Sequence, residues 1–297
     1  MRLPDFIIVG AMKCGTSGLH DQLARRSGLF LSNPKEPNFF SDDDVYRRGL
    51  DWYADLFAGA RAGQLCGESS THYTKLPTHP RSCDRMRALL PGVKLVYVMR
   101  HPIDRIISQY IHQWTENDVC GPLDEAVTQD ERFIAYSRYA TQLEPYLDAY
   151  GPGNVLPVFF EQLVAQPDAE LSRIVDFIGD HSPEAPCWAS THQVHNASSD
   201  RIRRSPLRDL ARNTPLGPLW RRVVSHSLRE RIKSRWQLKD RPTFSPEALA
   251  EVQATLDSDL SRLGGWLGRT LTCADWRQQV GDETPEWAPP APGREFA

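Results

Sequence analysis

The chain has 297 residues, of which 40% are hydrophobic and 25% are charged, and its formal net charge is −3. This composition is typical of one large α/β domain or two smaller ones, and the slightly acidic charge argues against a nucleic-acid partner. No apolar run approaches the roughly 20 residues of a membrane span and no basic-then-apolar leader precedes the first apolar segment, so we expect a cytoplasmic protein without a membrane partner.

The most informative segment lies near the N-terminus, where Phe6–Val9 predicts a buried strand that runs into a glycine-rich turn. Gly10 and Gly15 flank this turn, and a helix is expected over 19–26. Glycines let a backbone approach a phosphate closely, and the unpaired N–H groups and dipole of a helix start favour an anion. The segment predicts a phosphate-binding loop to which Lys13 adds positive charge, although an ordinary strand-to-helix turn has the same pattern.

This loop differs from the G-x-x-x-x-G-K-[ST] loop of nucleoside triphosphatases. Gly10 and Gly15 keep the glycine spacing, but Thr16 stands where the lysine is expected, and the lysine of this loop is Lys13. The arrangement of a lysine beside a magnesium-binding hydroxyl is therefore displaced. We expect a phosphate group here rather than a triphosphate with bound magnesium.

A short acidic site follows in the segment SNPKEPNFFSDDD, where Pro34 and Pro37 enclose Lys35 and Glu36. The two prolines predict an irregular, rigid segment rather than a helix interior. A carboxylate fixed in such a loop can remove a proton from an attacking hydroxyl. The alternative is a solvent-exposed charged pair.

A second apolar strand is predicted over 94–99, and it ends at Arg100. Pro102 fixes the next turn, a helix is expected over 103–114, and Ser108 lies about two helical turns along it. Arg100 and Ser108 reach the same phosphate if this helix folds back beside the strand. The alternatives are a surface ion pair for Arg100 and a solvated helix position for Ser108.

The remaining pattern alternates helices with strands. A third strand is expected over 155–160, where Pro157 indicates a position near an edge, and Pro145 predicts a kink in its helix. This alternation indicates a P-loop-like, three-layer α/β fold in which helices flank a central parallel sheet. Ligands in such sheets bind beyond the carboxyl ends of the strands. Helices are expected over residues 46–60, 81–90, 131–150, 169–178 and 249–267.

The C-terminal third contains a basic stretch. Residues 201–241 carry thirteen Lys and Arg against three Asp and Glu. Such a run forms a solvated helical face, a surface for an anionic partner, or a lid over a polyanionic ligand, and we favour the lid. The proline-rich tail, 281–297, is expected to be disordered.

The cysteines do not predict a metal site. None forms a C-x-x-C pair, and a reducing cytoplasm favours free thiols. We expect no bound metal. The six cysteines are Cys14, Cys66, Cys83, Cys120, Cys187 and Cys273.

Together these motifs resemble the sulfotransferases that use 3′-phosphoadenosine 5′-phosphosulfate (PAPS), especially the bacterial and heparan-sulfate-type branch. That branch has a K-x-G-T-[ST]-x-L loop, a K-E-x-x-F-F segment, and a strand ending in R-x-P-x-x-R before S-x-Y. The chain matches these motifs at Lys13–Leu19, Lys35–Phe40 and Arg100–Tyr110, and a C-terminal pattern at Ser245–Trp276. The resemblance implies a single sulfotransferase domain over residues 1–280, and a place in bacterial secondary metabolism.

The resemblance also implies roles for individual residues. Glu36 becomes the general base, Lys13 stabilises the charge on the bridging oxygen, and Arg100 and Ser108 bind the 3′-phosphate. The 5′-phosphate is held by the loop residues Gly15, Thr16, Ser17, Gly18 and Leu19. The donor is PAPS, the product is adenosine 3′,5′-bisphosphate, and the acceptor is a hydroxyl or amine of a small molecule or saccharide.

The chain departs from the family pattern at three places. Asn38 stands where the heparan-sulfate branch has histidine, and Ser69 replaces a lysine common in animal members. His72 is then a reserve base. The family's K-G-R loop corresponds to Lys239–Asp240–Arg241, in which Lys239 and Arg241 are the candidate phosphate contacts.

Two other functions remain open at this stage. A phosphate-loop kinase would use ATP and magnesium, and its missing GK[ST] signature argues against it. A non-catalytic nucleotide- or glycan-binding module would retain its function after Glu36→Gln. The sequence gives neither the acceptor's identity nor the oligomeric state.

Overall fold

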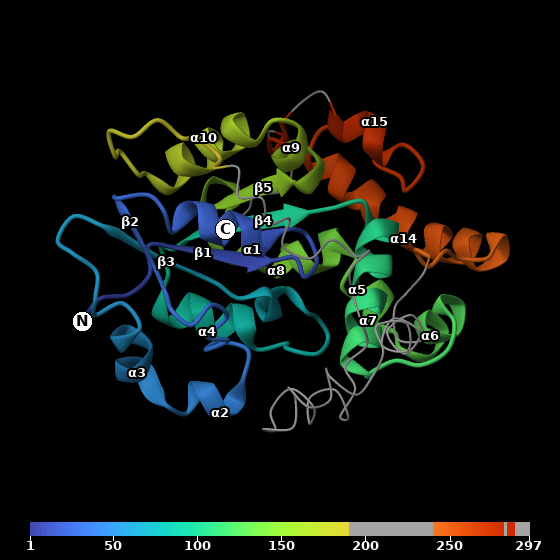
Figure 1. The fold of residues 1–297 in the computed structure, drawn as a ribbon, viewed down its shortest axis with the longest axis horizontal. Coiled ribbons are helices and arrows are strands. Elements are labelled where there is room, and N and C mark those ends of the chain that lie inside the picture. The colour runs from blue at the N-terminus through green and yellow to red at the C-terminus, as the bar shows by residue number, and fades with distance from the viewer. Residues whose placement is uncertain (190–239, 282–283, 289–297) are drawn as a thin grey trace, which may run out of the picture.

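The computed structural model describes residues 1–189, 240–281 and 284–288. Its centre is a five-stranded, fully parallel sheet with the strand order β2-β3-β1-β4-β5 (Figure 1). The strands are β1 (Phe6–Gly10), β2 (Leu29–Leu31), β3 (Leu65–Ser69), β4 (Lys94–Met99) and β5 (Val155–Phe159). Helices flank this sheet, so the predicted α/β fold class is confirmed.

The central strands form because their side chains are apolar on both faces of the sheet. Every residue of β1 is buried, and so is β4 after its first residue, as expected for strands covered by helices on both sides. Gly67 of β3 pairs with Phe6 of β1, and a Cβ atom at Gly67 would lie 2.2 Å from the Phe6 ring. Glycine is therefore required where this ring crosses β3.

Two helical layers cover the sheet. The helix α1 (Thr16–Leu23) packs on β1, β2 and β3, while α10 (Pro167–Ile178) packs on β4 and β5. An ion pair of 2.5 Å between Arg26 and Asp180 joins the chain segments that follow these two helices. The opposite layer contains α4 (Ser82–Leu89) and α8 (Tyr139–Tyr150), which contact each other. The connection from β1 to β2, which contains α1, runs one way along the sheet, while the connections from β3 to β4 and from β4 to β5, which contain α4 and α8, run the other way. Because such connections are right-handed, their helices lie on opposite faces.

The other helices surround these layers. They are α2 (Asp43–Tyr46), α3 (Gly49–Asp55), η1 (Thr71–Thr74), α5 (Pro102–Glu116), α6 (Leu123–Gln129), α7 (Arg132–Ala135), η2 (Pro152–Asn154), α9 (Phe160–Ala165), α14 (Pro246–Trp266) and α15 (Trp276–Gly281). The buried Asp259 of α14 accepts hydrogen bonds from the backbone N–H groups of Ala140 and Thr141, at 2.8 and 3.0 Å. This contact fixes α14 to the start of α8.

Several predicted elements differ in detail. The first helix begins at Thr16 rather than at 19, because the glycine-rich turn ends directly in the helix. The strand β3 was not predicted, since its sequence LCGES is neither apolar throughout nor alternating. Pro157 does lie on an edge strand, and Pro145 lies inside α8.

Part of the predicted disordered tail is ordered. The indole of Trp287 donates a hydrogen bond of 2.6 Å to the carbonyl of Val155, and the N–H of Ala288 donates one of 2.8 Å to Trp266. Residues 284–288 therefore pack against the sheet edge and the end of α14, unlike our expectation. The predicted basic lid lies outside the described residues, except for 240 and 241.

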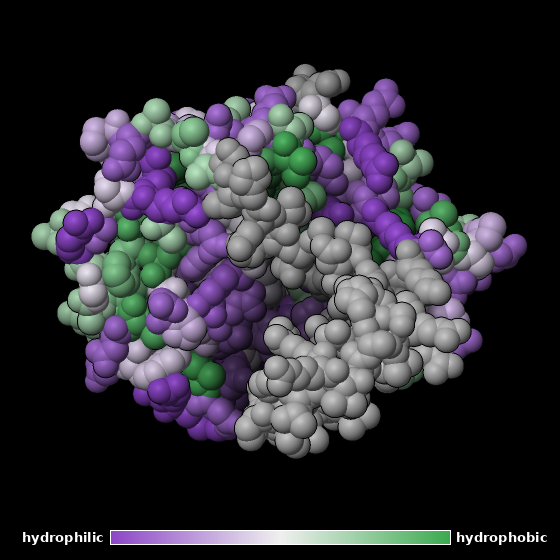
Figure 2. All heavy atoms as spheres, in the orientation of Figure 1, coloured by the Kyte–Doolittle hydropathy of each residue, from purple (hydrophilic) through white to green (hydrophobic). Residues whose placement is uncertain are grey.

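None of the helices that the structure describes is both long enough and apolar enough to span a membrane. Figure 2 shows hydrophilic residues near the centre of the face that it presents, with apolar residues more scattered around them.

Candidate active site

The candidate site lies at the edge of the sheet where the strands end. Because all five strands are parallel, the segments that follow them meet at this one edge. Lys13 follows β1, Glu36 follows β2, and Thr71 follows β3. Arg100 follows β4, and Phe160 follows β5. The topology thus gathers residues that are up to 147 positions apart, as counted from Lys13 to Phe160.

The loop after β1 has the backbone shape of an anion-binding turn. Lys13 and Gly15 have positive φ angles of 70° and 84°, and Gly15 is the N-cap of α1 without a side-chain cap. The first-turn N–H groups of α1 therefore have no intrahelical acceptor and point out of the helix end. A Cβ atom at Gly15 would lie 2.7 Å from the Phe160 ring, so the close approach needs glycine.

Arg100 lies against this loop. Its Nη1 atom donates a long hydrogen bond of 3.4 Å to the carbonyl of Lys13, and its guanidinium carbon lies 4.8 Å from the centre of the Phe160 ring. The Tyr139 hydroxyl donates a bond of 2.6 Å to the Arg100 carbonyl and fixes the end of β4. The two strand ends therefore carry Lys13 and Arg100 to one place.

The other predicted phosphate contacts lie further along α5 and the C-terminal segment. Ser108 is half-buried on α5. Arg241 is exposed and bonds to Asp104 of α5, to which Arg277 also donates at 2.9 Å. Burial raises the pKa of Asp104, but the two arginines outweigh it and the pKa is lowered. Lys239 lies outside the described residues.

Cys14, inside the loop, is buried, and burial raises the pKa of its thiol to about 11. It is a small, protonated residue of the turn rather than a reactive thiolate. All six cysteines are free thiols, as predicted.

The loop that carries Glu36 is held by the end of β3. The N–H of Glu36 donates to the Ser69 carbonyl at 3.0 Å, and the N–H of Asn38 donates to the Ser70 hydroxyl at 3.1 Å. Glu36 and Asn38 have positive φ angles of 58° and 54°, which a non-glycine residue adopts only when its surroundings fix it. Phe39 follows and is buried against the Tyr53 ring, with the centroids 4.4 Å apart.

A buried carboxylate, that of Glu68, stabilises the contacts between the Glu36 loop and the end of β3. Glu68 is fully buried and accepts hydrogen bonds from the hydroxyls of Tyr53 (2.6 Å), Tyr73 (2.8 Å) and Ser70 (2.7 Å). Burial raises the pKa of Glu68 despite these three donors. Because Ser70 also bonds to Asn38, Glu68 positions the Glu36 loop. Tyr53, Tyr73 and Phe39 are buried in the core.

The Glu36 carboxylate itself is partly exposed. Its Oε1 atom accepts a bond of 2.9 Å from the Lys35 ammonium and one of 3.3 Å from the Thr71 hydroxyl, and 32% of the side chain is accessible. Burial raises the pKa of Glu36, but Lys35 and Lys75 outweigh that effect and the pKa is lowered. Glu36 is therefore an anion at neutral pH, and its side chain is partly accessible to solvent.

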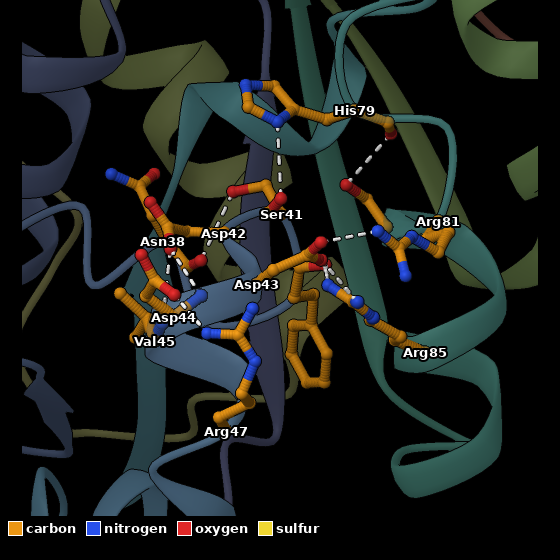
Figure 3. Close-up of polar contacts among 12 residues, drawn as sticks. Asn38, Ser41, Asp42, Asp43, Asp44, Val45, Arg47, His79, Arg81 and Arg85 are labelled. Atoms are coloured by element: carbon orange, nitrogen blue, oxygen red, sulfur yellow. Dashed lines mark hydrogen bonds and ion pairs between the residues drawn. The ribbon is translucent and has the colours of Figure 1, made fainter.

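The segment after Glu36 is clamped to α4 (Figure 3). Arg85 donates to the Phe40 carbonyl at 3.2 Å and to Asp43 at 2.5 Å, and Arg81 also bonds to Asp43. The Nδ1 atom of His79 donates to the Ser41 carbonyl at 3.2 Å. The segments that follow β2 and β3 thus form one rigid unit.

The histidines near Glu36 are neutral. His72 stacks on His79 with the centroids 4.8 Å apart, and burial lowers the pKa of His72 to about 4. His20 of α1 shares a hydrogen bond of 2.9 Å with the Ser69 hydroxyl, and burial lowers its pKa to about 4. Among the described residues, no cluster of His, Cys, Asp and Glu is suited to a metal ion.

Sequence reasoning missed three residues of this site. Glu68 and Thr71 belong to the segment after Gly67, of which only Ser69 was singled out, and Lys75 was not noted at all. No local signal marks them, because each one acts through a contact with a segment distant in the sequence.

These features define a parallel α/β protein with a glycine-rich loop at the head of its first helix and a fixed carboxylate at the same sheet edge. The chain belongs to the sulfotransferase domain family, whose sequence model matches residues 3–264.

Curated relatives agree with this assignment. A mouse heparan sulfate glucosamine 3-O-sulfotransferase 3B1 is 33% identical over 189 residues, which cover 60% of this chain and 46% of the relative. A bovine bifunctional heparan sulfate N-deacetylase/N-sulfotransferase 2 is 31% identical over 199 residues, which cover 60% of this chain and 22% of the relative. The chain thus matches about half of the first relative and a smaller part of the second.

Among solved structures, a sulfotransferase from Alicyclobacillus acidocaldarius has a TM-score of 0.67 and 23% sequence identity. It covers 93% of this chain and 100% of its own. This similarity shows the fold.

Proposed function

We propose that the protein transfers a sulfuryl group from PAPS to a hydroxyl or amine of a small-molecule or saccharide acceptor. The observation that carries the proposal is the meeting of a glycine-rich loop, Arg100 and the anionic Glu36 at one sheet edge. Membership of the sulfotransferase family supports the same reaction class.

The donor fits the loop after β1. First-turn N–H groups of α1 would hold its 5′-phosphate, together with the hydroxyls of Thr16 and Ser17. Arg100 and Ser108 would bind its 3′-phosphate, and Arg241 is a further candidate for that contact. Lys13 would lie near the oxygen that bridges phosphate and sulfur. These groups supply positive charge without a metal ion.

Glu36 would take the proton of the acceptor. The acceptor oxygen or nitrogen forms a bond to sulfur while the bond from sulfur to the bridging oxygen breaks. The proton goes to the Glu36 carboxylate, and the electron pair stays on the phosphate of adenosine 3′,5′-bisphosphate. His72, which is neutral and close to Glu36, is the reserve proton acceptor.

The relatives support the acceptor class only in outline. One is named as a 3-O-sulfotransferase and another as an N-sulfotransferase of heparan sulfate, so both a hydroxyl and an amine occur among similar proteins. A saccharide is therefore the first acceptor to test, followed by phenols and other small alcohols.

The proposal is tested with radiolabelled PAPS and an acceptor panel of saccharides and small alcohols. We expect a labelled product with the native protein, and a rate about 10²–10⁴ times lower for Glu36→Gln if this carboxylate is the base. Glu36→Gln should bind adenosine 3′,5′-bisphosphate like the native protein, because Glu36 faces the acceptor. Lys13→Met should lower the rate of transfer with a native fold.

Three results would reject the proposal. One is a native protein that binds neither PAPS nor the bisphosphate in calorimetry. Another is phosphoryl transfer from ATP that requires magnesium, which would indicate a kinase. A third is a Glu36→Gln variant that retains the full biological function of the native protein, which would indicate a binding module.

A further inference from the structure

Lys75 is a nearly buried lysine beside the proposed transfer centre, with 8% of its surface exposed. It directly follows η1, and its neighbour Thr74 donates a hydrogen bond of 2.8 Å to the carbonyl of Val9 in β1. The N–H of His79 donates to the Lys75 carbonyl at 3.0 Å. Lys75 is thus held between the strand that leads into the phosphate loop and the clamped segment of Figure 3.

The ammonium of Lys75 has no carboxylate partner of its own. Among the described residues, no ion pair within 4.0 Å involves Lys75, and its ammonium nitrogen lies 5.8 Å from the centre of the Tyr136 ring. The nearest acidic influence is Glu36, which already bonds to Lys35 and Thr71. Burying a lysine without a partner is costly, so a ligand that supplies negative charge would be bound favourably here.

The other groups around Lys75 do not supply that negative charge. Arg105 of α5 is fully buried and positive, and Arg132 of α7 is paired with Asp130 at 2.8 Å. Burial lowers the pKa of His79 and raises the pKa of Tyr136, so both are neutral near pH 7.

Counting charges gives an excess of positive charge. Lys35, Lys75, Arg105 and Arg132 contribute four positive charges, while Glu36, Asp130 and Asp42, which acts on His72 and His79, contribute three negative charges. His72 is neutral. A singly charged sulfate group would reduce this excess, whereas an uncharged acceptor would not.

We propose that Lys75 binds the sulfuryl oxygens of the donor, so that the transferred group lies between Lys75 and Lys13. This inference rests on the proposed function. During transfer the charge of Lys75 compensates the charge on the SO₃ oxygens as the sulfur–oxygen bond breaks.

The test compares two ligands that differ by the sulfuryl group, PAPS and adenosine 3′,5′-bisphosphate, by calorimetry without an acceptor. We expect Lys75→Met to weaken PAPS about 10- to 100-fold, as for loss of a charged hydrogen bond, and to leave the bisphosphate unchanged. Lys94→Met is the matched control, because Lys94 is half-buried at the opposite end of β4 and donates to the Phe177 carbonyl at 2.6 Å. It should change neither affinity.

Measuring both affinities at several pH values distinguishes a charged contact to the ligand from a purely structural role of Lys75, because a structural role would not make the preference for PAPS depend on pH. Burial lowers the pKa of Lys75 to about 8, so the ammonium loses its charge as the pH rises through that value. In the native protein the preference for PAPS over the bisphosphate should fall between pH 7 and 9.5. Lys75→Arg keeps its charge over this range and should keep the preference constant.

The possible failures are distinguishable. If the native protein binds neither ligand, the proposed function itself is rejected. If it binds both, but Lys75→Met weakens both equally or neither, the inference about Lys75 is wrong and the proposed function stands. The preference for PAPS could also fall with rising pH in Lys75→Arg as it does in the native protein. That result would overturn the inference about Lys75, since a group other than Lys75 would then titrate.

Discussion

Two halves of the site are built in different ways. The phosphate-loop half comprises residues 10–19 and 100–108, and its shape comes mainly from the backbone: glycines, positive φ angles and a helix end. The Glu36 half comprises residues 35–43 and 68–82, and it depends on side-chain hydrogen bonds to Glu68, Thr71, Arg81 and Arg85.

The difference reflects what each half is suited to bind. A phosphate carries a fixed charge and shape, and backbone N–H groups can hold it with little dependence on side chains. A proton acceptor needs a set charge state, which neighbouring side chains determine through burial and charge. The two halves should therefore respond differently to glycine substitutions and to pH.

The largest expected effect is at the point where the halves meet. A Cβ atom at Gly10 would lie 2.0 Å from the Thr74 hydroxyl and 2.9 Å from the Tyr97 ring. Thr74 cannot move away freely, because it bonds to Val9, so Gly10→Ala should lower the free energy of unfolding by about 1–3 kcal/mol. Urea denaturation measures this. Gly92→Ala, which has open space around it, should leave the stability nearly unchanged.

The next prediction separates ligand binding from folding. Gly15→Ala places a side chain at φ 84° and against the Phe160 ring, at a cost of about 1–3 kcal/mol. Part of this strain falls on the loop, so the affinity for adenosine 3′,5′-bisphosphate should fall about tenfold. Gly63→Ala has a similar φ of 85° without a close neighbour, and it should not change the affinity. Equal affinities for the native protein and Gly15→Ala would contradict the assigned loop geometry.

Glu68 gives the Glu36 half a characteristic pH dependence. The pKa of Glu68 is higher in the folded protein than in the unfolded chain. The stabilisation that Glu68 contributes is therefore complete at pH values below its pKa in the unfolded chain. It is lost as the pH rises through its pKa in the folded protein. Glu68→Gln has no charge to bury. Relative to the native protein, this variant should therefore gain stability as the pH rises above about 4.5, an unperturbed glutamate value. Urea unfolding at several pH values measures the trend, and a constant difference would count against it.

Asp104, on α5 in the phosphate-loop half, should show the smallest effect and the opposite sign. The pKa of Asp104 is lower in the folded protein than in the unfolded chain. The stabilisation that Asp104 contributes is therefore present at pH values above its pKa in the unfolded chain, and it is lost as the pH falls through its pKa in the folded protein. The two arginines that it binds are exposed, so Asp104→Asn should cost only about 0.2–1 kcal/mol at neutral pH. The difference from the native protein should disappear in acid. A difference that grows as the pH falls would contradict this assignment.

The sequence identified the phosphate-loop half more completely than the Glu36 half. The loop between β1 and α1 is local, and its glycines and lysine are visible within ten residues. Arg100 was found because a continuous apolar run leads directly to it. In contrast, β3 was missed, since Glu68 and Ser69 are polar. Glu68 is buried under the hydroxyls of Tyr53 and Tyr73, and Ser69 shares a hydrogen bond with the ring of His20.

The sequence by itself determined the parallel α/β architecture, because long apolar runs and glycine-rich turns have few other folded states. It also placed Lys13 in the turn after the first predicted strand, Glu36 in a loop bounded by two prolines, and Arg100 at the end of the second predicted strand. Only the tertiary structure decided that these residues meet at one edge, that Glu36 is an anion, and that Lys75 is buried beside it. Charge states and buried polar contacts depend on the distance and solvent access of groups far apart in the chain, and local patterns carry no record of either.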